Sequence, residues 1–167
     1  MYQRGFTLIE VVIYIGLFAF IMTGALISVY SVFSTASHNQ AKVLVQEEGS
    51  FILGKIEWTS SSISSANVSP DGLTLSVIKV DPTFGNPIVI NISGGTASIT
   101  RGSNPSQTLS NSNVSISCPV GGCFTHTLSG GTGINPESVS AKFTALSRTS
   151  EGVPFSQDFS TIKYLRK

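Results

Sequence analysis

A single apolar run near the N-terminus constrains the fold of this chain more than any other feature. The run begins at Val11, ends at Phe33 and reads VVIYIGLFAFIMTGALISVYSVF, without one charged side chain. As a helix, a run of this length can cross a hydrocarbon core of about 30 Å. We therefore predict a membrane-spanning helix over these residues, and any globular domain must be built from the sequence that follows.

The carboxylate of Glu10 lies directly before this run. It is the only side chain between Gly5 and Ser37 that is charged at neutral pH. An unpaired carboxylate that enters lipid costs about 2.5 kcal/mol or more. Such a group needs a partner, so Glu10 is a candidate functional residue.

The segment around Glu10 reads RGFTLIE over residues 4–10. It resembles the class III signal of type IV pilins and type II secretion pseudopilins. The resemblance implies that a prepilin peptidase at the inner face of the membrane cuts after Gly5 and N-methylates Phe6, the new first residue. It also implies that Glu10 is the family's glutamate, which pairs during assembly with the positive N-terminal amine of Phe6 in a neighbouring subunit.

The position of the implied cut separates this segment from an ordinary secretory signal. Such a signal carries its cleavage site after the apolar core, so cleavage removes the core. Here the cut precedes the core, and the helix stays on the mature protein. Arg4, the single charged side chain of the leader, suits the excess of positive charge on the cytoplasmic side of membrane proteins. A plain signal anchor that begins with Arg and runs apolar is the alternative.

The same resemblance implies where the protein resides and what it contacts. The expected location is the cytoplasmic (inner) membrane, as a single-pass protein with an extracytoplasmic C-terminal domain, and then a pilus or pseudopilus. The expected partners are prepilin peptidase, other pilin or pseudopilin subunits, the inner-membrane assembly platform and membrane lipid. No cofactor is expected.

Length and composition predict one small domain beyond the membrane helix. We divide the 167 residues into a leader (residues 1–5), an apolar polymerisation helix (residues 6–35) and an extracytoplasmic domain (residues 36–167). The net charge is +1 with 11% charged residues, which lacks the basic footprint of a nucleic-acid-binding protein. Ser and Thr are abundant after residue 57, as is typical of strands and exported surfaces.

The helix is predicted to continue beyond the membrane, from Phe6 to about Ser64. Apolar residues recur at spacings of four and seven and keep one face of a helix: Ala41, Val45, Ile52, Ile56 and Ile63. The helix ends before the turn sequence PDG at residues 70–72. Trp58 is expected to anchor the helix to a sheet, and Gly16 and Gly24 either permit close approach of neighbouring helices or only loosen the helix.

Beyond Gly72 the apolar period changes from helical to two, which predicts about seven short antiparallel strands. The candidate strands cover residues 73–77, 88–92, 97–101, 114–118, 124–128, 138–146 and 159–165. Residues 93–96, which read SGGT, form a hairpin turn. The predicted fold class is α+β, with a long N-terminal helix, membrane-spanning in its first half, packed on a small antiparallel β-sheet domain in a pilin-like arrangement.

Two cysteines, Cys118 and Cys123, flank the sequence PVGG. In an oxidising compartment this pattern predicts a disulfide that closes a tight turn. A metal site is less favoured, because about four ligands are needed and only His126 lies nearby. Two free thiols in a reducing setting remain an alternative.

No catalytic constellation is recognisable, so we predict that the protein is not an enzyme. His38 and His126 are the only histidines, and His126 alternates with Phe124 and Leu128, as a packed or edge side chain would. The serines lack a GxSxG elbow, and the glycine pairs lack the lysine of a phosphate loop. No metal is expected.

The order of the predicted elements adds a finer resemblance. The sequences PDGLTL (residues 70–75), ITR (99–101), VSI (114–116) and FSTIKYLR (159–166) are laid out as in J-type minor pseudopilins and the corresponding minor pilins. This implies a structural subunit of a pilus, competence pilus or secretion pseudopilus, in its tip or initiating complex. The alternative from another class is a membrane-anchored extracytoplasmic module that binds a ligand or surface and uses the helix only as an anchor.

Overall fold

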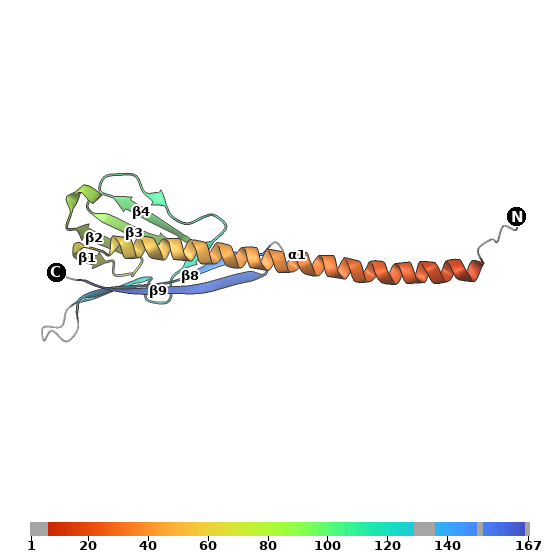
Figure 1. Cartoon of the computed structure of the whole chain (residues 1–167). Coiled ribbons are helices and arrows are strands. Elements are labelled where there is room, and N and C mark those ends of the chain that lie inside the picture. The colour runs from red at the N-terminus through yellow and green to blue at the C-terminus, as the bar shows by residue number, and fades with distance from the viewer. Residues whose placement is uncertain (1–6, 129–135, 150–151, 166–167) are drawn as a thin grey trace. The chain divides into compact units, whose positions relative to one another are not determined.

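The computed structural model describes residues 7–128, 136–149 and 152–165. Within these residues the chain forms one long helix, α1 (Leu8–Thr59), a short 3₁₀ helix (Pro82–Phe84) and nine strands in two sheets (Figure 1). The chain divides into two compact units, Met1–Asn39 and Gln40–Lys167. The first contains the apolar part of α1, and the second contains the rest of α1 and all the strands.

The first unit is helical from Leu8 onward. Thr7 precedes the helix, and its hydroxyl Oγ1 accepts a hydrogen bond from the backbone N–H of Glu10 at 3.4 Å, as an N-cap residue does. No side chain from Leu8 to Asn39 is buried. By its length and composition, the helix is long and apolar enough to cross a membrane.

In the second unit α1 turns one face inward. The buried residues on this face are Ala41, Val45, Gly49, Ile52, Ile56 and Thr59. They include four of the five residues from which the stripe was predicted, and the prediction of a helix that continues past residue 39 is therefore confirmed.

The predicted helix end near Ser64 is wrong, because α1 ends at Thr59. Ser61 tightens the last turn: its backbone N–H and its hydroxyl both donate to the carbonyl of Trp58, at 3.2 and 2.7 Å. Ser62 then takes a positive φ of 50° and reverses the chain. Ile63 begins strand β1 (Ile63–Val68) and enters the core from there, so its burial fits a helical period by coincidence.

The first sheet has five antiparallel strands in the order of the sequence: β1, β2 (Thr74–Lys79), β3 (Ile88–Ser93), β4 (Thr96–Arg101) and β5 (Gln107–Thr108). Ser93 pairs with Thr96 across the predicted hairpin turn. Strands β1 and β5 were not predicted. The sequence of β1, ISSANV, is largely polar, and β5 has only two residues.

The second sheet is built around β8 (Ser138–Arg148). One edge of β8 pairs with β6 (Ser115–Ser117) and β7 (Phe124–Thr127), and the other pairs with β9 (Pro154–Tyr164) over its whole length. The sequence predicted antiparallel strands but did not predict their division into two sheets. Alternation identifies a strand and its buried face, but it does not say with which strand that strand pairs.

The two sheets and the inner face of α1 enclose one hydrophobic core. Val45, Ile52 and Ile56 of the helix belong to it, together with Leu75 of the first sheet and Phe143 of the second. The α+β fold predicted from the sequence, a long helix packed on antiparallel sheet, is confirmed.

Gly49 lets the second sheet approach the helix closely. A Cβ at this position would lie 2.1 Å from the ring of Phe159 in β9, and that ring stacks on Phe143 with centroids 5.5 Å apart. At Gly54, one and a half turns further on, nothing lies within 4 Å of such a Cβ. Only the first of these glycines is required by packing.

Candidate functional site

The first turns of α1 position the one carboxylate of the apolar helix. Glu10 is the third residue of the helix, where the positive end of the helix dipole favours a negative charge. The phenol of Tyr14, one turn later, donates a hydrogen bond to Glu10 Oε1 at 3.3 Å. Sequence reasoning selected Glu10 and missed Tyr14, although a spacing of four residues on a helix places two side chains together.

Two of the predicted site residues, Gly5 and Phe6, lie outside the described residues. The apolar run from Val11 to Phe33 lies within α1. Its large side chains are strongly exposed, as the 81% exposed fraction of Phe20 illustrates. The described part of this unit therefore offers an apolar helical surface that no other part of it covers.

Residues 1–26 match the family model of the prokaryotic N-terminal methylation motif. The matched segment contains Gly5, Phe6 and Glu10 and the first part of the apolar run. It supports the type IV pilin-like class, and with the apolar helix it supports membrane anchoring and a place in a pilus. The motif implies processing by prepilin peptidase and assembly with other pilins, which suggests a structural subunit rather than an enzyme. No curated protein and no solved structure matches the chain.

A disulfide joins Cys118 and Cys123 and closes a turn against the turn between β1 and β2. The backbone N–H groups of Cys123 and Phe124 both donate to the carbonyl of Gly72, each at 2.9 Å. A Cβ on Gly122 would lie 2.4 Å from Gly72 Cα, and both glycines have positive φ. The disulfide turn therefore fastens the second sheet to the first by backbone contact.

Lys79 at the end of β2 holds the C-terminal end of α1. Its side chain is buried, and its ammonium donates to the carbonyls of Trp58 and Ser61, the latter at 2.7 Å. The same ammonium lies 4.5 Å from the centroid of the Trp58 ring, and Arg101 lies 4.8 Å from it. Burial lowers the pKa of Lys79. Trp58 thus anchors the helix to the sheet, as the sequence predicted, but it does so through two cations that the sequence did not reveal.

The two histidines lie on different elements, His38 on α1 and His126 on β7. His126 Nε2 lies 3.0 Å from Glu137 Oε1, and both side chains are largely buried. His38 is an exposed residue of α1. In the part of the chain that the structure describes, no three His, Cys, Asp or Glu side chains gather where they could hold a metal ion.

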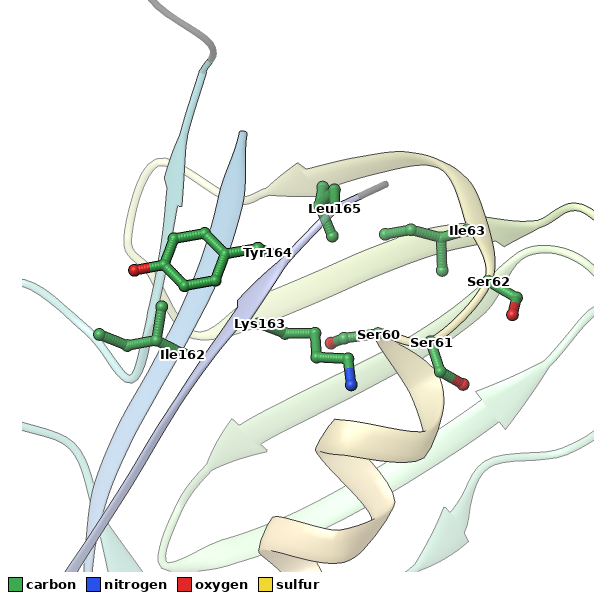
Figure 2. Close-up of a pocket in the computed structure, with 8 residues that line it drawn as sticks. All are labelled: Ser60, Ser61, Ser62, Ile63, Ile162, Lys163, Tyr164 and Leu165. Atoms are coloured by element: carbon green, nitrogen blue, oxygen red, sulfur yellow. The ribbon is translucent and has the colours of Figure 1, made fainter. Parts of the chain in front are cut away.

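A pocket of about 560 Å³ lies where α1 gives way to β1, beside the end of β9. Residues 60–63 and 162–165 line it (Figure 2). Figure 2 shows the side chain of Lys163 directed toward Ser60 and Ser61. Among the described residues that line the pocket, Lys163 is the one side chain that is charged at neutral pH.

Proposed function

We propose that this chain is a minor pilin or pseudopilin, a structural subunit of a type IV pilus, a competence pilus or a type II secretion pseudopilus. The observation that carries the proposal is the exposed apolar helix with a single carboxylate, Glu10, inside a match to the N-terminal methylation motif. We place the subunit in the tip or initiating complex. The order of elements from the PDG turn to the C-terminal strand, which resembles the J-type layout, supports this finer assignment.

Processing and topology follow from the motif. Prepilin peptidase cleaves after Gly5, and the mature protein begins with N-methyl-Phe6. The run from Val11 to Phe33 spans the inner membrane, and residues 36–167 form the extracytoplasmic domain. The disulfide at Cys118 suits this location, because disulfides persist in oxidising compartments.

Glu10 acts in assembly through its charge. In the membrane or the filament core, its carboxylate pairs with the N-terminal amine of Phe6 in a neighbouring subunit. Two opposite charges at contact attract far more strongly in a low dielectric than in water. Either charge alone in that environment is costly. The pair therefore favours docking of a subunit in the correct axial position.

The test is Glu10→Ala in the full chain, with Glu47→Ala as the matched control. Glu47 is an exposed carboxylate of α1 outside the methylation motif. The expected result for Glu10→Ala is loss of co-purification with filament partners at an unchanged level in the membrane fraction, because insertion and domain folding do not use this carboxylate. Glu10→Gln should show a milder defect, and Glu47→Ala none.

Mass spectrometry of the membrane-extracted protein checks the processing step in the same preparations. The expected N-terminus is N-methyl-Phe6. Normal co-assembly of Glu10→Ala, or an intact Met1, would contradict the pilin function. Either result would favour the membrane-anchored binding module.

A further inference from the structure

We propose that Tyr14 is a positioning residue, which holds the Glu10 carboxylate while the subunit is alone in the membrane and releases it to the incoming amine during assembly. The inference rests on the proposed function, because it assigns a partner to Glu10 for the stage before a second subunit arrives. It concerns a side chain that lies next to the assembly contact without forming it.

The contact between the two side chains is direct. Tyr14 Oη donates to Glu10 Oε1 at 3.3 Å across one turn of α1, and residues four apart lie on the same helical face. Glu10 is only partly exposed, whereas its neighbour Ile9 is 69% exposed. The residue that accepts from Tyr14 is thus less exposed than the residue beside it on the helix.

Other hydroxyls of the apolar helix serve a different purpose. Thr23, Ser28 and Thr35 each donate to the backbone carbonyl four residues earlier, at 2.8, 2.9 and 2.9 Å. Short hydroxyl side chains reach the backbone of their own helix, whereas the phenol of Tyr14 extends far enough to reach a side chain. Tyr30 has Leu26 and Ser34 at the corresponding spacing, and thus no carboxylate that could accept a hydrogen bond from its phenol.

The N-cap sequence would allow another arrangement. Thr7 and Glu10 have the spacing of a capping box, in which the glutamate side chain reaches back to the N-cap backbone. The threonine half is formed, since Thr7 Oγ1 accepts from the Glu10 N–H. The carboxylate, however, accepts from Tyr14, one turn further into the helix. Tyr14 thus decides the direction in which the carboxylate points.

The chemistry of the two partners explains the exchange. A carboxylate in lipid finds no water, and a hydrogen bond to an ionised acceptor is roughly twice as strong as one between neutral groups. The phenol therefore stabilises Glu10 in the lone subunit. An ammonium brings a full opposite charge to the same oxygen, and in a low dielectric this attraction exceeds that of a neutral hydroxyl. Replacement of the phenol by the amine therefore lowers the free energy.

The first experiment tests the contact in the lone subunit. The mature full-length chain, labelled with ¹³Cζ-tyrosine, is placed in lipid nanodiscs, and Tyr14→Phe and Tyr30→Phe identify the two helix resonances. Glu10→Ala should shift the Tyr14 resonance and leave that of Tyr30 in place. If the chemical shift of Tyr14 is the same with and without Glu10→Ala, the proposal is overturned.

The second experiment tests the role in cells whose assembly motor is inactive. Tyr14→Phe should lower the level of mature subunit in the membrane by roughly three- to tenfold, the size expected for one hydrogen bond. Tyr30→Phe should not lower this level. In a chain that already carries Glu10→Ala, Tyr14→Phe should not lower it either, because the carboxylate that needs the hydrogen bond is gone. An equal loss from Tyr30→Phe, or one that persists with Glu10→Ala, would reduce Tyr14 to a packing residue.

Both measurements are made without assembly. A negative result therefore removes the role of Tyr14 and leaves the pilin function to its own test. Conversely, normal co-assembly of Glu10→Ala would refute that function whatever the tyrosine resonances do.

Discussion

Residues 8–39 and residues 40–59 belong to the same helix, but they use their apolar side chains in opposite ways. In the first part, Phe20 is 81% exposed and Leu26 is 68% exposed. In the second part, Val45 and Ile52 are completely buried. The second part finds its packing partners within the chain, on the two sheets. Within the described residues of its own unit the first part has none, and an exposed apolar surface of this kind suits lipid or other helices.

The largest effect expected from this difference comes from Ile52→Ala, compared with Ile21→Ala. Ile52→Ala leaves a cavity in the core and should lower the free energy of unfolding of the domain by about 2–5 kcal/mol. Ile21 is 65% exposed, and its truncation should leave that free energy unchanged. Chemical unfolding of both variants in detergent measures the effect. Equal losses would show that the apolar run also belongs to the folded core.

Loss of the disulfide should have the next largest effect. The double variant Cys118→Ser and Cys123→Ser should lower the free energy of unfolding of the domain by at most about 2–3 kcal/mol, because the closed loop is short. Membrane insertion of the apolar helix should be unaffected. Denaturation with and without reductant measures the loss in the unmodified protein. In the non-reduced protein both thiols should resist alkylation, and quantitative labelling would contradict the bridge.

The helix glycines give effects of opposite sign. Gly49→Ala should lower the free energy of unfolding by about 1–3 kcal/mol, the usual range for overpacking, because the new methyl meets the Phe159 ring. Gly54→Ala should raise it by up to about 1 kcal/mol through helix propensity alone. Thermal melting of the two variants compares them. If Gly49→Ala stabilises the domain, Phe159 of β9 does not pack closely against the helix at this position.

The smallest expected effect is a pH dependence at the β1–β2 turn. Hydrogen bonds from the Ser69 hydroxyl and the Leu73 N–H lower the pKa of Asp71 from its ordinary value of 3.8. The folded state binds this proton less readily than the unfolded state. The contribution of Asp71 to stability is therefore complete above pH 3.8 and is lost as the pH falls through the lowered pKa.

Acid unfolding of Asp71→Asn, compared with the unmodified protein, measures this contribution. The variant should lack that part of the acid sensitivity. An unchanged slope between pH 5 and pH 2 would show that the turn does not depend on the charge.

Residues 40–59, the part of the helix that packs on the sheets, could be predicted from the sequence because their apolar residues recur with a helical period. Ala41, Val45, Ile52 and Ile56 mark its buried face in the sequence, and the structure buries all four. The alternation over residues 88–92 and the SGGT turn likewise identified the β3–β4 hairpin. Each of these features is local, since a few consecutive residues determine it.

The features that were missed depend on residues far apart in the chain. The end of α1 is held by Ser61 and also by Lys79, whose ammonium reaches the carbonyls of Trp58 and Ser61 from another element. The division into two sheets depends on which strands pair with β8 and which pair with one another in the first sheet. At the candidate site, Glu10 was evident as a lone carboxylate in an apolar run. Tyr14 was not, because a tyrosine in such a run reads as one more apolar residue.

The contact between Gly49 and Phe159 has a consequence for the order in which the domain matures. Synthesis from the N-terminus makes α1 first and β9 late, so the space at Gly49 is filled only after nearly the whole chain has been made. Until Phe159 is in place, the helix lacks the aromatic ring that packs against this position. The packing of one phenyl ring therefore distinguishes a completely folded domain from one that still lacks its last strand.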